Sequence, residues 1–99
     1  MPIDVEIQNE SGDALARYEG PPLGLKFTKM APPCGACMRF IVPWGDTTFY
    51  QEQITVLREE LREAANRTQE QDRLLELGAV LAFLEGATGV HVYVKFIGD

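Results

Sequence analysis

Both ends of the chain alternate apolar and polar side chains, and this pattern constrains the fold more than any other feature of the sequence. Residues 3–8 alternate in this way, and so do residues 90–97. The apolar rows are Ile3, Val5 and Ile7 at the start and Val90, Val92, Val94 and Phe96 at the end. Because successive side chains of a β-strand point to opposite faces, each segment predicts a strand with one buried face. The chain must therefore build a sheet that is covered on at least one side.

The length of 99 residues limits the chain to one hydrophobic core, because two cores would leave each half with too little buried surface to fold. Hydrophobic residues make up 45% of the sequence, which is typical of packed globular proteins rather than of disordered chains. We therefore expect residues 1–99 to form a single domain.

The first half of the sequence predicts strands that are separated by turns and a loop. Residues 9–13 contain turn-forming side chains and a glycine, and residues 14–18 resume an extended pattern, which predicts an N-terminal hairpin. Glycine and proline are dense between residues 19 and 37, so we expect no helix there and at most a short edge strand at residues 25–29. Residues 38–42 are β-prone and are predicted to form a third strand that pairs with the last one.

The apolar period changes from two to that of a helix at about Thr48. Apolar residues recur at helical spacing until residues 66–68 interrupt them, and residues 69–85 then form a second, more broadly apolar helix. Thr48 with Gln51, and Thr68 with Gln71, match the capping-box pattern that begins a helix. The sequence predicts a helical hairpin whose second helix is either sandwiched or faces a partner.

These elements predict an α+β fold. We expect a mostly antiparallel sheet of about four strands, covered on one face by the helical hairpin, with the order β-β-β-α-α-β.

The charge balance disfavours nucleic acid as a partner. The chain has 15 acidic and 9 basic side chains and a formal charge of -6, so a phosphate backbone would be repelled. No apolar run approaches the roughly 20 residues that span a bilayer, and the start lacks a basic, apolar leader pattern. We expect a cytoplasmic protein that binds neither nucleic acid nor membrane.

Cys34 and Cys37 are the most chemically suggestive pair. Two intervening residues allow both sulfurs to bind one metal ion or to form a small disulfide ring. The pair precedes a β-prone run rather than a helix, however, and His91 is the only further cysteine or histidine in the chain. We favour the interpretation that the two cysteines are small residues in a tight loop, with no cofactor. The alternative is a thiol-redox or zinc role, which includes a four-cysteine site across a dimer axis.

Residues 44–50 place three aromatic side chains around a short polar turn. One interpretation is architectural, with Asp46 or Thr48 capping the following helix. The other is a recognition surface, because tryptophan and tyrosine are favoured interface anchors. The candidate partner-binding residues are Trp44, Asp46, Tyr50 and, in the second helix, Phe83.

Other polar residues give no catalytic prediction. His91 has no accompanying nucleophile or metal-binding motif, and we interpret it as an exposed or satisfied strand histidine. Glu59, Glu60 and Glu63 alternate with arginines at helical spacing, which predicts surface ion pairs on a solvated face.

Two stretches of the chain resemble a known kind of protein. Residues 39–49 and residues 91–99 are similar to small uncharacterised bacterial proteins that share an R-F-[IV]-x-P-[YW]-G-D-T-x-F segment and a closing H-x-Y-x-K-F-x-G-D. The stretches cover about a fifth of the chain and do not include the two cysteines. The resemblance implies a bacterial source and brings no activity with it.

The sequence therefore predicts a small acidic module that is non-catalytic and serves interaction or regulation. It would bind another protein, or a copy of itself as a homodimer, through a sheet edge, the broad apolar helix or the Trp44 turn. An immunity-type inhibitor of a basic toxin is one version of this hypothesis. The alternatives are a thiol or zinc protein that uses Cys34 and Cys37, and a small-molecule-binding domain with a pocket between helices and sheet.

Overall fold

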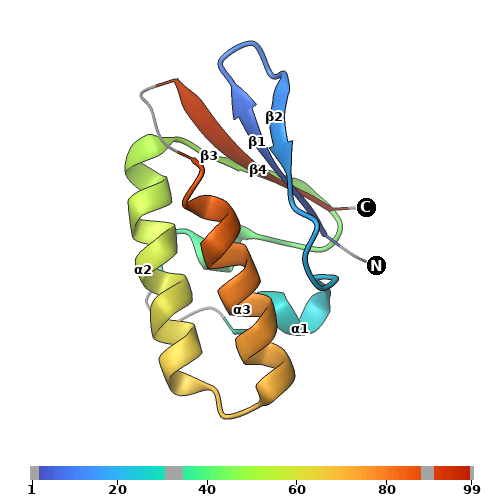
Figure 1. The fold of residues 1–99 in the computed structure, drawn as a ribbon, viewed down its shortest axis with the longest axis vertical. Coiled ribbons are helices and arrows are strands. Elements are labelled where there is room, and N and C mark those ends of the chain that lie inside the picture. The colour runs from blue at the N-terminus through green and yellow to red at the C-terminus, as the bar shows by residue number, and fades with distance from the viewer. Residues whose placement is uncertain (1–2, 31–34, 88–90, 99) are drawn as a thin grey trace.

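The computed structural model describes residues 3–30, 35–87 and 91–98 (Figure 1). Its elements are β1 (Asp4–Asn9), β2 (Ala14–Arg17), α1 (Leu25–Thr28), the one-turn 3-10 helix η1 (Met38–Phe40), β3 (Asp46–Phe49), α2 (Gln51–Arg67), α3 (Gln71–Leu84) and β4 (Val92–Ile97). The four strands form one antiparallel sheet, and α2 and α3 form the helical hairpin. The α+β fold predicted from the sequence is confirmed.

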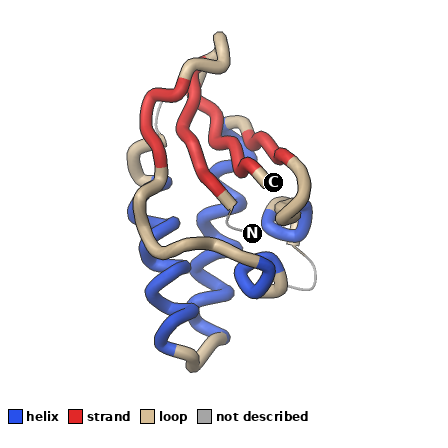
Figure 2. The backbone as a smooth tube through the Cα atoms, turned by 90° about the vertical axis from the view of Figure 1, so that its right-hand side faces the viewer, coloured by secondary structure: helices blue, strands red, loops and turns tan. Residues whose placement is uncertain are grey.

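The two terminal strands form the middle of the sheet. The strand order is β2-β1-β4-β3, and each neighbouring pair is antiparallel. β1 and β4 pair along their whole length, from Asp4 opposite Ile97 to Asn9 opposite Val92. Figure 2 shows the strands in one layer and the long helices in another. β2 and β3 are therefore the two edges of the sheet.

The core lies between the sheet and the helical hairpin. Ile3, Val5 and Ile7 are buried, which confirms the apolar face predicted for the first strand. β4 adds the fully buried Val94, which lies beside Ile7 in the sheet, and the helices contribute the fully buried Leu57, Leu61, Leu77, Val80 and Leu84. Burial of each leucine contributes about 1.5–3 kcal/mol to stability relative to leaving it in water. These side chains belong to one hydrophobic cluster.

The helical hairpin begins and turns close to the predicted positions. α2 starts at Gln51, and the Tyr50 N–H before it donates to Oε1 of Gln53 at 3.2 Å. Thr48 lies in β3, so its predicted role as a cap is wrong. At the turn, the Thr68 hydroxyl oxygen accepts the N–H of Glu70 at 3.3 Å, and α3 starts at Gln71. No helix in the described ranges is long and apolar enough to cross a bilayer.

The predicted third strand at residues 38–42 is wrong. Met38–Phe40 forms η1, and the strand that pairs with β4 is β3, from Asp46 opposite Ile97 to Phe49 opposite Val94. Met38 and Ile41 are both buried, and a spacing of three residues brings side chains to one side of a 3-10 turn. Burial of these two side chains therefore overrides the β propensity of the segment.

Residues 25–28 form one helical turn, not the short edge strand predicted there. The glycines and prolines that suggested the absence of a helix lie before residue 25 and after residue 30. Phe27 of this turn is fully buried, and its ring stacks on Phe96 of β4 with centroids 6.4 Å apart. The turn is thus held by packing onto the core rather than by helix propensity.

Candidate functional site

Two large aromatic side chains are exposed next to the β3 edge of the sheet. Trp44 is 72% exposed and Phe40 is 53% exposed, and both precede β3. The guanidinium of Arg39 lies 4.8 Å from the centre of the Phe40 ring. Within the described residues, no strand pairs with the outer side of β3. We call Phe40, Trp44 and the outer side of β3 the aromatic edge.

The backbone that carries these aromatic side chains is held in place. The Thr47 hydroxyl donates to the Phe40 carbonyl at 2.9 Å, and the Gly98 N–H donates to the Gly45 carbonyl at 3.0 Å. Gly98 approaches Gly45 so closely that a Cβ at position 98 would lie 2.5 Å from the Gly45 nitrogen. The exposed aromatic side chains therefore project from a constrained loop.

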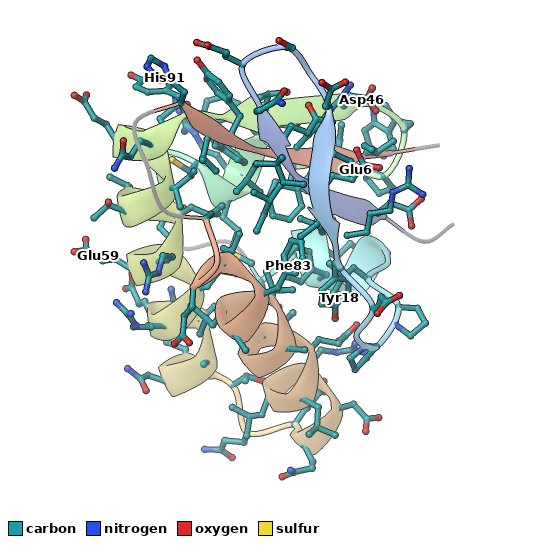
Figure 3. All side chains as sticks on the ribbon, turned by 45° about the horizontal axis from the view of Figure 1, so that its top comes forward. Glu6, Tyr18, Asp46, Glu59, Phe83 and His91 are labelled. Carbon is teal, nitrogen blue, oxygen red and sulfur yellow. The ribbon has the colours of Figure 1, made fainter. Side chains whose placement is uncertain are left out.

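The predicted partner-binding residues do not all lie together. Asp46 begins β3 and forms an ion pair with Lys95 at 3.6 Å, while Tyr50 follows the other end of the strand and is 49% exposed. Phe83 is half-buried, and its ring meets Tyr18 edge-on with centroids 5.8 Å apart (Figure 3). Tyr18 follows β2, on the opposite edge of the sheet from β3. Trp44 and Asp46 therefore share one region of the molecule, and Phe83 lies at another.

Glu60 occupies a position that sequence reasoning missed. Its side chain is 7% exposed, so the predicted solvated, ion-paired role is wrong for this residue. The carboxylate accepts three consecutive backbone N–H groups, from Ala36 at 2.8 Å, Cys37 at 3.1 Å and Met38 at 2.8 Å. We call this set of hydrogen bonds the Glu60 clamp. N–H groups at the start of a helix have no acceptor within the helix. The clamp therefore supplies acceptors for the N–H groups at the beginning of η1.

The sequence contained one signal for this position. Glu60 is three residues after Leu57 and four before Ala64, both of which are buried on the core side of α2. Side chains at these spacings share one face of a helix, whereas Glu59 and Glu63 point to solvent. A carboxylate on an apolar stripe indicates a buried acceptor, but its partners are 22 to 24 residues away along the chain.

Cys37 lies beside the Glu60 clamp and has the properties of a protected thiol. Its side chain is 2% exposed, and its sulfur lies 3.5 Å from the Gln53 carbonyl, to which the thiol donates. Burial, together with the negative charge of Glu60, raises the pKa of the Cys37 thiol. Redox and metal-binding cysteines act as thiolates, which this environment disfavours. Cys34, the other half of the predicted pair, lies outside the described residues.

Groups of possible metal ligands and the single histidine are the remaining candidates for a site. In the described ranges, no group of three or more histidine, cysteine, aspartate or glutamate side chains is placed to hold a metal ion. His91 is exposed just before β4, and its Nδ1 lies 3.2 Å from the Glu10 carboxylate at the β1–β2 turn. This position agrees with the interpretation of an exposed histidine.

A second buried carboxylate, that of Glu76 in α3, lies near Tyr18 at the end of the N-terminal hairpin. Glu76 is buried and forms an ion pair with Arg73, which also reaches Glu70 at 3.3 Å. The Tyr18 hydroxyl donates to the Pro21 carbonyl at 2.8 Å. Burial, and secondarily the charge of Glu76, raises the pKa of Tyr18 to about 12. The edge-on ring contact of Tyr18 with Phe83 is what joins this segment to α3.

A surface hollow of about 290 Å³ lies near the helical turn, lined by Lys29, Met30, Thr68, Glu70 and Arg73. Its lining comes from the residues after α1, from the turn between α2 and α3 and from α3, and includes no residue of the sheet. Its cationic Arg73 is already neutralised by Glu70 and Glu76. The lining mixes cationic, anionic and apolar side chains, and so does not define one ligand class.

Comparison of the chain with family models, with curated proteins and with solved structures finds no match. The resemblance of residues 39–49 and 91–99 to small bacterial proteins therefore stays a prediction.

Proposed function

We propose that this protein is a non-catalytic interaction module, and that it binds an extended segment of a partner protein along the aromatic edge. The observation that carries the proposal is Trp44, which is 72% exposed on a constrained loop beside an unpaired strand edge. The partner segment would pair with β3, and Trp44 and Phe40 would anchor it.

An exposed tryptophan and an unpaired strand edge both favour the binding of a partner segment. A tryptophan side chain gains more from burial than almost any other residue, and such residues often dominate the binding energy of interfaces. An edge strand presents unpaired backbone N–H and C=O groups, which an added strand can satisfy. The aromatic edge combines both features within a few residues of the chain.

The charge of the chain favours a basic partner. The formal charge is -6, and the exposed Glu52 lies in the first turn of α2, just after β3, whereas Asp46 at the start of β3 is paired with Lys95. Acidic charge accelerates capture of a basic partner and disfavours pairing between two copies of this chain. A basic, extended segment is therefore the occupant that fits this edge.

The test uses random peptides displayed on phage and selected against the immobilised protein. We expect the selected peptides to be basic and to lose about tenfold or more in affinity for the Trp44→Ala variant. Leu75→Ala is the matched control, because Leu75 is 56% exposed on α3, outside the aromatic edge, and its removal should change affinity by less than about twofold. Equal binding to wild type and Trp44→Ala would refute the proposal.

Self-association is the competing outcome at the same surface. Sedimentation equilibrium over a range of protein concentrations distinguishes a monomer from a dimer. A dimer that Trp44→Ala dissociates would assign the aromatic edge to a second copy of the chain, and would overturn the proposal of a basic partner.

A further inference from the structure

The Glu60 clamp stands at the start of the segment that carries the aromatic edge. Residues 36–38 donate to the carboxylate, Phe40 ends η1, and Trp44 follows four residues later. Glu60 itself belongs to the middle of α2, which packs against α3 and contacts β4. The clamp thus connects the helical hairpin directly to the loop that presents Phe40 and Trp44.

Few other contacts hold the backbone of this segment. Residues 36–45 belong to no strand. Among the described residues, two further hydrogen bonds tie the backbone of this segment to β3 and to the end of the chain, from the Thr47 hydroxyl to the Phe40 carbonyl and from the Gly98 N–H to the Gly45 carbonyl. Met38 and Ile41 add buried side chains. Among these contacts, only the clamp depends on an ionisable side chain.

The clamp requires both oxygens of an ionised carboxyl group. One oxygen accepts Ala36 and Cys37, at 2.8 and 3.1 Å, and the other accepts Met38 at 2.8 Å. A glutamine of the same shape offers one acceptor oxygen, and its NH₂ group would face a backbone N–H donor. Replacement of Glu60 by glutamine therefore breaks part of the clamp without leaving a cavity.

We infer that Glu60 is a latch, a positioning residue that holds residues 36–38 closed and thereby fixes the aromatic edge. When the latch opens, residues 36–38 separate locally from α2 and uncover the Cys37 thiol, while the sheet and the helical hairpin stay folded. Opening of the latch should also weaken partner binding at the aromatic edge, and this consequence rests on the proposed function. The local opening of residues 36–38 does not depend on it.

The test measures the reaction of Cys37 with 5,5′-dithiobis(2-nitrobenzoate) in a Cys34→Ser background, without any partner. We expect Glu60→Gln to accelerate the reaction by about tenfold or more, at a rate that changes little with low concentrations of urea, as local opening requires. Glu76→Gln is the matched control, because Glu76 is equally buried in α3 and forms no hydrogen bond with residues 36–38 among those described. Its reaction rate should match that of the Cys34→Ser parent.

A second measurement covers the case in which Glu60→Gln fails to fold. Amide hydrogen exchange in the Cys34→Ser parent should then show Ala36, Cys37 and Met38 exchanging together, faster than the core amide of Val94. Reaction or exchange that occurs only through global unfolding, with the same urea dependence as the unfolding equilibrium, would overturn the latch. Because neither assay contains a partner, a failure of the peptide-binding test leaves this result unaffected.

Discussion

The carboxylate of Glu60 accepts the backbone N–H of Cys37, 23 residues earlier in the chain, and so caps a helical turn to which it does not belong. Cys37 is the residue that precedes η1, and its own side chain makes no capping hydrogen bond. Serine, threonine, aspartate and asparagine normally supply this acceptor locally. Here α2 supplies it, so formation of η1 depends on the docking of a distant helix.

The Glu60 clamp should contribute substantially to stability. Hydrogen bonds to a charged group are stronger than neutral ones, and buried N–H donors left without an acceptor are costly, so Glu60→Gln should lower the free energy of unfolding by about 3 kcal/mol. Urea denaturation followed by circular dichroism measures this loss. Glu59→Gln, at the exposed neighbouring position, should change the free energy by less than about 0.5 kcal/mol. Equal effects of the two variants would contradict a special role for Glu60.

The Cys37 thiol should react slowly in the folded protein. Its raised pKa leaves a smaller thiolate fraction at any given pH, and burial blocks the reagent. In the Cys34→Ser background, alkylation by iodoacetamide at mildly alkaline pH should be about 100-fold slower in buffer than in concentrated urea. Mass spectrometry follows the modified fraction with time. Alkylation as fast in buffer as in urea would instead support the thiol-redox alternative.

Local periodicity was sufficient to predict most of the architecture. The alternation around Val5 and Val94 and the helical spacing of Leu57 and Leu61 identify elements whose side chains face one core, and burial of all four is confirmed. Such patterns can be recognised in a sequence because the spacing of side chains on one face is set by the geometry of the helix or strand itself. The positions of β1, β4 and the helical hairpin along the chain follow from them.

The remaining features depend on contacts between distant segments. Residues 38–42 have the composition of a strand, yet burial of Met38 and Ile41 selects a 3-10 turn. The partners of Glu60 and the pairing of Phe83 with Tyr18 are set by how the layers dock. A single sequence does not show which distant segments dock, so neither the partners of Glu60 nor the contact of Phe83 with Tyr18 could be predicted from it.

Tyr18 should ionise only at strongly alkaline pH. The chain has three tyrosines, and burial with the nearby Glu76 carboxylate raises the pKa of Tyr18 to about 12, from an ordinary value of 10.0. Absorbance of tyrosinate against pH should show a component near pH 12 that is absent from Tyr18→Phe. Because the folded state holds this proton more tightly, the stability that the neutral phenol contributes is complete below pH 10 and is lost between about pH 10 and 12.

The comparison with Tyr18→Phe isolates that contribution, because other groups also titrate at high pH. The difference in unfolding free energy between wild type and Tyr18→Phe should change sign or shrink as pH rises through this range. A difference that stays constant would show that Tyr18 ionises normally in the folded protein.

Replacement of glycine by alanine should have opposite effects on stability at Gly98 and at Gly78. A Cβ at position 98 would lie 2.5 Å from the Gly45 nitrogen and carbonyl oxygen, so Gly98→Ala must displace the loop that presents Trp44. We expect a loss of about 1–3 kcal/mol in the free energy of unfolding, which is the usual cost of overpacking. A Cβ at Gly78, on the exposed side of α3, meets no atom within 4 Å.

Gly78→Ala should therefore stabilise the protein by about 0.5–1 kcal/mol, because alanine has a higher helix propensity than glycine and restricts the unfolded chain. Thermal denaturation of both variants measures the two opposite changes in stability. Gly98→Ala should also weaken peptide binding at the aromatic edge, because Gly98 holds Gly45 next to Trp44, whereas Gly78→Ala should leave binding unchanged. Stabilisation by both substitutions would mean that the Gly98–Gly45 contact yields easily, and that the loop beneath Trp44 is not constrained by it.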